Sequence, residues 1–264
     1  MDECSSRIDG RLEPVLTTAD DHGLPVVRET VEEPGDRWYG RLLVASYETA
    51  ATERETDSVQ AAAAAVELFR GYCRLQSRLL VQLIDRWPHS ITHDPTSVLL
   101  GSDYLYTAAY SMLGNVTQSA LGDSFEVLVN TATGIMESFA GIYAETARSE
   151  WDQREFFDET AGAVGEGAAV LGATLAGGDD TRRDRIAAVG RGLSTARQIH
   201  RVLDAGPVAA MVIPPEFDER RLREHAERRG TDAMRALDAL SPPEGATTLR
   251  AFASAASSVL PGDA

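Results

Sequence analysis

Residues 58–87 read SVQAAAAAVELFRGYCRLQSRLLVQLIDRW, and this stretch decides the fold class. Its apolar residues recur three, four and seven positions apart, which is the spacing of one face of an α-helix. Pro88 ends the predicted helix, because proline lacks the N–H that a helix interior requires. The apolar face consists of Val66, Phe69, Tyr72, Cys73, Leu75, Leu79, Leu80, Leu83 and Ile84.

The rest of the chain shows the same helical periodicity, and almost no stretch alternates like a strand. Asp94 followed by Pro95 is a typical helix start, and that predicted helix continues to Gly114. We therefore predict an all-α domain over residues 37–264. Residues 1–36 are polar and contain several prolines, so we predict an N-terminal arm that is mobile or loosely packed. Further helices are predicted near 119–149, 152–176, 181–204, 217–240 and 245–259.

The composition is acidic, with 41 Asp and Glu against 25 basic residues, and every basic residue is Arg. This charge argues against a nucleic-acid partner. No run of 18 apolar residues and no secretory signal are visible, so we expect a cytoplasmic protein without a membrane span. An acidic surface without Lys is typical of a high-salt cytoplasm, although a GC-rich genome would also favour Arg codons. Two distant cysteines, Cys4 and Cys73, predict neither a zinc site nor a disulfide framework.

The stretch AGAVGEGAA at residues 161–169 is rich in small residues. It does not match the G-x-G-x-x-G spacing of a phosphate-binding loop, and no predicted strand precedes it. We interpret it as a place where two helices approach each other closely.

Several segments resemble the trans-isoprenyl diphosphate synthases, and they occur in the order of that family. The resemblance covers about residues 35 to 260 and implies a bundle of long helices around a deep central cavity, usually dimeric. It also implies condensation of an allylic diphosphate with isopentenyl diphosphate. The matching segments are GDRWYGRLL at 35–43 (family G-K-R-x-R-P), AAVEL at 64–68, PT at 95–96 with LLGSDYL at 99–105, ETA at 159–161 (family K-T-A), ARQIHRVLD at 196–204 (family A-F-Q-I-x-D-D-x-L-D) and ALDAL at 236–240.

The chemistry of that family needs Mg²⁺, which neutralises the leaving diphosphate and is held by carboxylates of two Asp-rich motifs on facing helices. In this chain the first motif falls on SRLLV at residues 77–81, which contains no acid. In the second, Arg201-Val202 replaces the paired Asp, and only Asp204 remains. We therefore predict no bound metal or cofactor and assign no catalytic residue. His89 and His93 are flanked by Pro88 and Pro95, so we do not interpret them as a metal pair.

Basic residues that would hold diphosphate in the family are also depleted, because Asp36 and Glu159 replace lysines and Tyr39 replaces an arginine. The candidates that remain for anion binding are Arg37, Arg41, Arg78 and Arg201. Arg78 and Arg201 can be interpreted in two ways: as fixed charges that replace Mg²⁺, or as ion-pair partners of acids in a closed, disused cavity, which we favour. The candidate cavity-lining residues are Ser77, Val81, Asp85, Asp103, Thr160, Gln198 and Asp204.

The sequence thus predicts a degenerate isoprenyl diphosphate synthase-like protein without catalytic activity. It would act as a regulatory or scaffolding subunit, as a homodimer or as a heterodimer with an active synthase. Two alternatives stay open. One is an active prenyltransferase with altered metal or diphosphate binding. The other is a carrier that binds an isoprenoid chain without chemistry.

Overall fold

The computed structural model describes residues 3–51, 57–83, 93–144, 151–240 and 246–258, and over these residues the chain is helical without a strand. The all-α prediction is therefore confirmed. The elements are α1 (Glu3–Asp21), α2 (Pro25–Glu32), α3 (Trp38–Ala50), α4 (Asp57–Leu83), α5 (Pro95–Leu113), α6 (Gln118–Tyr143), α7 (Gln153–Phe157), the π-helical turn η1 (Asp158–Gly162), α8 (Ala163–Leu175), α9 (Asp180–Ala205), the 3₁₀ turn η2 (Pro207–Ala209), α10 (Glu219–Asp238) and α11 (Thr247–Ser258).

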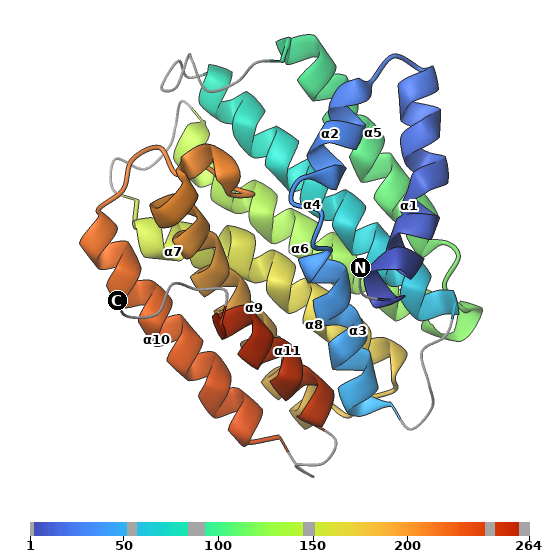
Figure 1. Cartoon of the computed structure of the whole chain (residues 1–264), viewed down its shortest axis with the longest axis vertical. Helices are drawn as coiled ribbons and strands as arrows, with labels where there is room; N and C mark the ends of the chain where they lie inside the picture. The colour runs from blue at the N-terminus through green and yellow to red at the C-terminus, as the bar shows by residue number, and fades with distance from the viewer. Residues whose placement is uncertain (1–2, 52–56, 84–92, 145–150, 241–245, 259–264) are drawn as a thin grey trace.

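Helix α8 lies in the middle of the bundle, where it packs against α3, α6 and α9 (Figure 1). Helix α10 flanks α9 at one edge, and α5 flanks α4 near the opposite edge, where α1 and α2 also lie. Elements α7, η1 and α8 follow one another without a break, so the helix predicted at 152–176 is present with one π-helical turn inside it.

The start of α4 is a run of small residues that lets α3 come close. All five alanines at 61–65 are fully buried. Beside them the buried carboxylate of Glu67 accepts a hydrogen bond from the N–H of Gly40 (2.9 Å) and one from Nε of Arg70 (2.9 Å). The guanidinium of Arg70 also donates to backbone carbonyls, so both buried charges are paired and hydrogen-bonded.

Glycines bring α8 into contact with its neighbours, as the small-residue stretch predicted. A Cβ atom on Gly165 would lie 2.3 Å from Cβ of Ser194 and 2.5 Å from the carbonyl oxygen of Gly190, both on α9. A Cβ on Gly172 would lie 2.2 Å from the carbonyl oxygen of Leu43 on α3. Only hydrogen fits at these positions, because any larger group would overlap backbone atoms.

The N-terminal segment is not the mobile or loosely packed arm that we predicted. Residues 3–32 form α1 and α2, and Ile8, Leu12 and Leu16 of α1 are buried in the main core. These apolar residues are spaced by four but are diluted by charged neighbours, which hid the pattern. Pro14 lies on the exposed face of α1, where the carbonyl that has lost its partner can bond to water.

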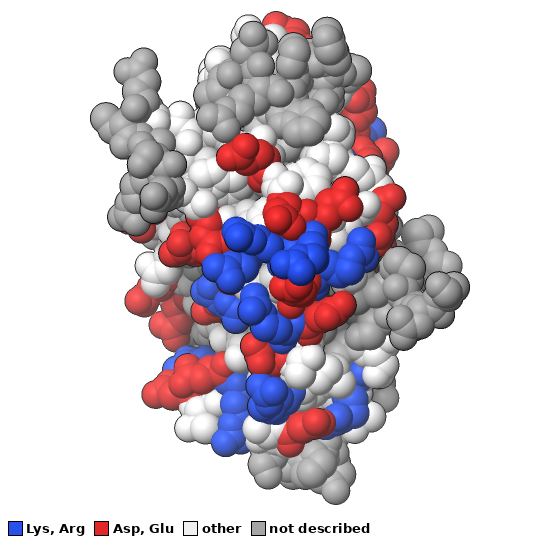
Figure 2. All heavy atoms as spheres, turned by 90° about the vertical axis from the view of Figure 1, so that its left-hand side faces the viewer, with Lys and Arg blue, Asp and Glu red and all other residues white. Residues whose placement is uncertain are grey.

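Charged side chains of both signs cover the face that carries α7 and α10 (Figure 2). Along α10, Arg235 pairs with Asp232 (2.7 Å) and Arg220 with Glu224 (3.8 Å). The buried residues of this helix, such as Leu222, form one narrow stripe, and the charged residues around them face the solvent. Among the described helices, none combines the length and the apolar content that crossing a bilayer requires.

Candidate functional site

The positions that correspond to the Asp-rich motifs face each other across a short segment, residues 207–213, which we call the plug. Ser77 on α4 accepts a hydrogen bond from the N–H of Ile213 (2.8 Å). Gln198 on α9 accepts one from the N–H of Met211 (2.8 Å) and donates to the hydroxyl of Tyr39 (3.1 Å). Both helices therefore use polar side chains at these positions to hold the plug in place.

The sequence after α9 explains why the chain turns back into this space. Gly206 has φ +85° and ψ 162°, a conformation that residues with a side chain rarely adopt. The four residues from Ala210 to Ile213 that follow η2 are then almost completely buried. Burial of each larger apolar side chain in this group stabilises the closed arrangement by about 1.5–3 kcal/mol.

Arg78 and Arg201 also bind the plug, through its carbonyl groups. Arg78 donates to the carbonyl oxygen of Val208 (2.9 Å), and Nε of Arg201 donates to that of Ala209 (3.0 Å). Asp204 is exposed, and Asp85 lies outside the described residues. The two arginines therefore bind backbone oxygens, whereas the interpretation that we favoured required acidic partners.

Burial disfavours the charged form of these arginines and so lowers their pKa. Desolvation lowers the pKa of both Arg78 and Arg201, and nearby acids offset this effect only in part. Burial lowers the pKa of Arg74 to about 10, although its guanidinium lies 2.9 Å from the carboxylate of Glu33. Burial acts to raise the pKa of Glu33, but the charge of Arg74 and the hydrogen bond from it hold that pKa below the ordinary value. The cluster therefore contains more arginines than acids, and its arginines lower one another's pKa.

Little room remains beside this arginine cluster. The void that its residues line has a volume of about 10 Å³, which is the space of a single water molecule. A diphosphate does not fit there unless the plug moves. The lining of the void includes Asp36, Tyr39, Arg70, Arg74, Gln198 and Arg201.

The donor atoms at these positions do not fit Mg²⁺, which takes hard oxygen ligands and above all carboxylates. Ser77 contributes one hydroxyl that is already engaged, Arg78 and Arg201 are cations, and Val81 is a fully buried aliphatic residue. Across the residues that the structure describes, no group of three His, Cys, Asp or Glu side chains could hold a metal ion.

The other predicted site residues do not join this cluster. Arg37 is buried and donates to Asp9 (2.6 Å) and to the carbonyl of Val31, so it is an interior ion-pair partner. Arg41 is half-buried one turn later on α3. Asp103 is exposed on α5, and the buried Thr160 donates its hydroxyl proton to the carbonyl of Phe156.

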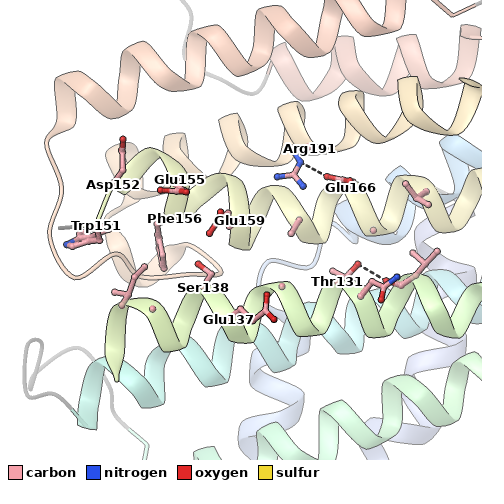
Figure 3. A pocket seen from close by; sticks show the side chains of 18 residues that line it. Thr131, Glu137, Ser138, Trp151, Asp152, Glu155, Phe156, Glu159, Glu166 and Arg191 are labelled. Carbon is pink, nitrogen blue, oxygen red and sulfur yellow. Dashed lines mark hydrogen bonds and ion pairs between the residues drawn. The ribbon is translucent and has the colours of Figure 1, made fainter. Parts of the chain in front are cut away.

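The large cavity of the protein lies elsewhere, between α6 on one side and α7, η1 and α8 on the other. Its volume is about 680 Å³. Figure 3 shows Glu137 and Ser138 of α6 facing Phe156 and Glu159 across this space. We call it the acidic cavity, because the charged residues that line it are Glu137, Asp152, Glu155, Glu159, Glu166 and a single basic residue, Arg191.

Only some of these acids have a cationic partner. Arg191 pairs with Glu166, and a hydrogen bond from Arg154 lowers the pKa of Asp152 to about 2. Glu159 has a raised pKa, first because it is partly desolvated and then because the carboxylate of Glu155 lies one helical turn away. Neither of these two glutamates, nor Glu137, forms an ion pair with any basic residue in the described part of the chain.

A hydrogen-bond network at η1 borders a groove of about 420 Å³ beside the acidic cavity, and Glu155, Glu159 and Arg191 line this groove as well. Asp158 accepts hydrogen bonds from Nε2 of His225 (3.0 Å) and Nε of Arg229 (2.8 Å). Nδ1 of His225 lies 3.1 Å from a guanidinium nitrogen of Arg228. Both ring nitrogens are thus occupied, so this histidine holds α10 against η1 and has no nitrogen free to act as a base.

The sequence did not single out Asp158, His225 or Ser138. A signal was present for His225, because it lies at a buried position of the apolar stripe of α10, three residues after Leu222. Nothing comparable marks Ser138, since a serine inside a helix carries no pattern of its own.

Solved structures share this architecture. A putative farnesyl-diphosphate synthase from Marinomonas sp. MED121 is 17% identical over 96% of each chain, with a TM-score of 0.70. A geranyltranstransferase from Methanosarcina mazei is 17% identical over 95% of each chain, with a TM-score of 0.71. This chain has the fold of the isoprenyl diphosphate synthases. The fold that the motif resemblance implied is therefore confirmed.

A third solved structure with this fold is a deletion mutant of the heterotetrameric geranyl pyrophosphate synthase of mint. It is 14% identical, covers 96% of this chain and 99% of its own, and has a TM-score of 0.67. No family model and no curated protein sequence matches this chain. At these low identities the likeness establishes the fold alone, so the activity has to be inferred from the site itself.

Proposed function

We propose that this chain is a non-catalytic subunit with the isoprenyl diphosphate synthase fold, which assembles with an active isoprenyl diphosphate synthase. The observation that carries this proposal is the plug. The polar residues at the two Asp-rich motif positions bind the backbone of residues 207–213, and the plug fills the space between α4 and α9. A site closed in this way favours a structural role over prenyl transfer.

The charge distribution supports the same role. Prenyl transfer needs positive charge to stabilise the departing diphosphate. Here the half-buried Arg78 and Arg201 donate to carbonyl groups, and the charged lining of the 680 Å³ cavity is mainly carboxylates, which repel an anion. We further propose that the protein works without Mg²⁺, because the exposed Asp204 is the one carboxylate left at the motif positions.

An apolar surface is available for the partner subunit. Leu99, Leu100 and Tyr106 on α5 and Val129 on α6 are exposed, although soluble surfaces normally hide large apolar side chains of this kind when they lie together. A groove of about 530 Å³ between α4, α5 and α6 includes Tyr106 and Val129 in its lining. We propose that an active synthase covers this face, an arrangement for which the heterotetrameric mint enzyme offers a precedent.

Two measurements test the loss of catalysis. The purified protein, assayed in high salt with Mg²⁺, geranyl or farnesyl diphosphate and isopentenyl diphosphate, should release no product. Isothermal titration with pyrophosphate in the absence of metal should give no heat. Product formation would overturn the proposal. Pyrophosphate binding that disappears in Arg78→Ala would instead support the interpretation that arginines replace the metal.

The subunit role is tested by co-expression with an isoprenyl diphosphate synthase from the same cells. Co-purification and a change in the rate or product length of that synthase are expected. Tyr106→Glu together with Val129→Glu should abolish both effects, because both residues line the groove and two charges would enter it. Leu83→Glu is the control, since Leu83 is exposed at the end of α4 and does not line the groove. Absence of any complex with every synthase of the cell would contradict the subunit role.

A prenyl-chain carrier is the less favoured alternative. The apolar interior between α4, α6 and α8, where a chain of this kind would be expected, contains a void of only about 10 Å³. That volume holds one water molecule and no isoprenoid. Organic extraction of the purified protein followed by mass spectrometry should therefore recover no isoprenoid.

A further inference from the structure

We propose that the acidic cavity binds an organic ammonium ion that carries an apolar body. This site lies outside the plug, and Glu137 is its one lining residue that also lines the groove of the proposed partner face. The variants that test the site leave Glu137 unchanged, so the test is independent of the proposed function. Its volume of about 680 Å³ lies in the range that pockets for small organic ligands occupy.

The first observation is the unbalanced charge of the cavity. Glu137 projects from α6, and Glu155 and Glu159 project from the opposite wall, one helical turn apart (Figure 3). These three carboxylates have no basic partner among the described residues, whereas Asp152 and Glu166 are each paired with an arginine. A cation placed between the two walls would relieve the repulsion between Glu155 and Glu159 and interact with Glu137 as well.

The second observation is independent of the acids and concerns Ser138. Its side chain is only 8% exposed and lines the cavity, yet its Oγ atom has no hydrogen-bond partner in the described structure. Buried hydroxyl groups are normally hydrogen-bonded, because an unsatisfied polar atom costs free energy. An ammonium group, with its N–H donors, can supply the missing hydrogen bond once the Ser138 side chain turns Oγ, which is shielded in this conformation, toward the cavity.

The third observation concerns the apolar part of the ligand. Phe156, which is buried, and Trp151 line the same cavity with their rings in edge-to-face contact, 5.9 Å between centroids. Ile142 and Val170 extend this apolar lining. An apolar body can pack on these side chains, and aromatic faces also attract cations. A fully charged polyamine would leave this apolar lining without a complementary contact.

Isothermal titration of the full-length protein with 2-phenylethylamine tests the site. Two further probes of similar shape separate the contributions: 3-phenylpropanoate carries the opposite charge, and 2-phenylethanol carries none. Binding of the amine in the micromolar to millimolar range is expected, at least tenfold tighter than the alcohol, with no binding of the carboxylate. Spermidine should bind more weakly than the aromatic amine at equal ionic strength.

Substitutions inside and outside the cavity lining test where the amine binds. Glu155→Gln with Glu159→Gln should weaken the amine at least fivefold. Asp123→Asn with Glu126→Gln removes the same charge from exposed positions of α6 outside the cavity lining and should leave the affinity unchanged. Ser138→Ala should weaken the amine about threefold without reducing the melting temperature, because it removes an unsatisfied hydroxyl.

A further substitution fills the cavity and leaves its charged residues unchanged. Gly134 lines the cavity, and a Cβ atom added there would meet no other atom within 4 Å, so Gly134→Phe can project its ring into the open space. This variant should abolish binding of the amine. Gly122→Phe, on the same helix and equally unobstructed but outside the cavity lining, should not. Three results would overturn the proposal. 3-Phenylpropanoate or 2-phenylethanol binds as tightly as the amine, or the amine gives no heat up to millimolar concentration. The third is that neither the Glu155→Gln, Glu159→Gln double variant nor Gly134→Phe changes the affinity for the amine.

Discussion

The plug region and the acidic cavity have opposite combinations of charge and space. Between α4 and α9, arginines remain, but residues 207–213 fill the room between them and the void measures about 10 Å³. Between α6 and α8, about 680 Å³ stays open, but carboxylates outnumber the single arginine. A diphosphate needs positive charge and room together, and neither region offers both.

The difference between the two regions shows how this fold stays stable without the carboxylates of the Asp-rich motifs. At the motif positions Ser77 and Gln198 accept hydrogen bonds from the backbone N–H groups of Ile213 and Met211. Closure satisfies these two backbone groups, which favours the closed arrangement. In the cavity the carboxylates of Glu155 and Glu159 lie one helical turn apart, and the charge of Glu155 helps to raise the pKa of Glu159.

The largest expected effect is a difference in stability between two glycine substitutions, one at a closed helix contact and one facing the open cavity. Gly165→Ala should destabilise the protein by roughly 3 kcal/mol, because its Cβ would overlap atoms of Ser194 and Gly190 that cannot move freely. Gly134→Ala, which faces the open cavity, should stabilise it by up to about 1 kcal/mol, since alanine favours a helix more than glycine does. Chemical denaturation of both variants measures the difference. Equal effects would mean that the bundle can widen at α8 and that the closed packing is not rigid.

A smaller effect on stability, which depends on pH, is expected from Asp158 and its hydrogen-bond partners beside the cavity. Burial acts to raise the pKa of Asp158, but hydrogen bonds from His225 and Arg229 overcome it and hold the pKa below its ordinary value. Because the folded-state pKa is lowered, this stabilisation is present above the unfolded pKa of about 3.9 and is lost as the pH falls through the folded value.

Asp158→Asn should therefore lower the free energy of unfolding by about 2 kcal/mol at pH 7 and flatten its decline below about pH 4. Urea denaturation at several pH values measures this. Asp204→Asn, at an exposed position of α9, is the control and should leave both the stability and the acid slope nearly unchanged. An unaltered acid slope in Asp158→Asn would show that other carboxylates control the acid sensitivity.

Next in size is the cost of loosening the plug. Gln198→Leu has nearly the same volume but leaves the N–H of Met211 without its partner and removes one of the two hydrogen bonds of the Tyr39 hydroxyl, which should cost about 1–2 kcal/mol. Hydrogen exchange at residues 210–213 should accelerate more than in α8, because only the plug loses its anchor. Uniform acceleration throughout the bundle would indicate that the plug does not open by itself and would weaken the comparison.

The helices and the fold class could be predicted from the sequence, because a helix repeats its apolar face many times. Glycines such as Gly165, in the stretch of small residues, also indicated a close contact between helices. The sequence also located the motif positions from Ser77 to Val81 and near Arg201. It could not predict the plug, since hydrogen bonds from Arg201 and Gln198 to a nearby backbone segment leave no trace in residue spacing. The acidic cavity was missed for the same reason: Glu137 and Glu159 lie far apart in the sequence and meet only in the folded chain.

The smallest expected effect tests whether the cavity acids really repel each other. The folded-state pKa of Glu159 is raised, so its contribution to stability is present below the unfolded pKa of about 4.3 and is lost as the pH rises through the folded value. Glu159→Gln should therefore stabilise the protein by about 0.2–0.5 kcal/mol at pH 7, a modest gain because both side chains are exposed and screened by water. The gain should vanish near pH 4. Glu155→Gln should give a similar gain, and the double variant should gain less than the sum, since either substitution alone removes the repulsion. A Glu159→Gln variant that is less stable at pH 7 would mean that this carboxylate already has a favourable partner and that the cavity lacks the excess charge that separates it from the plug region.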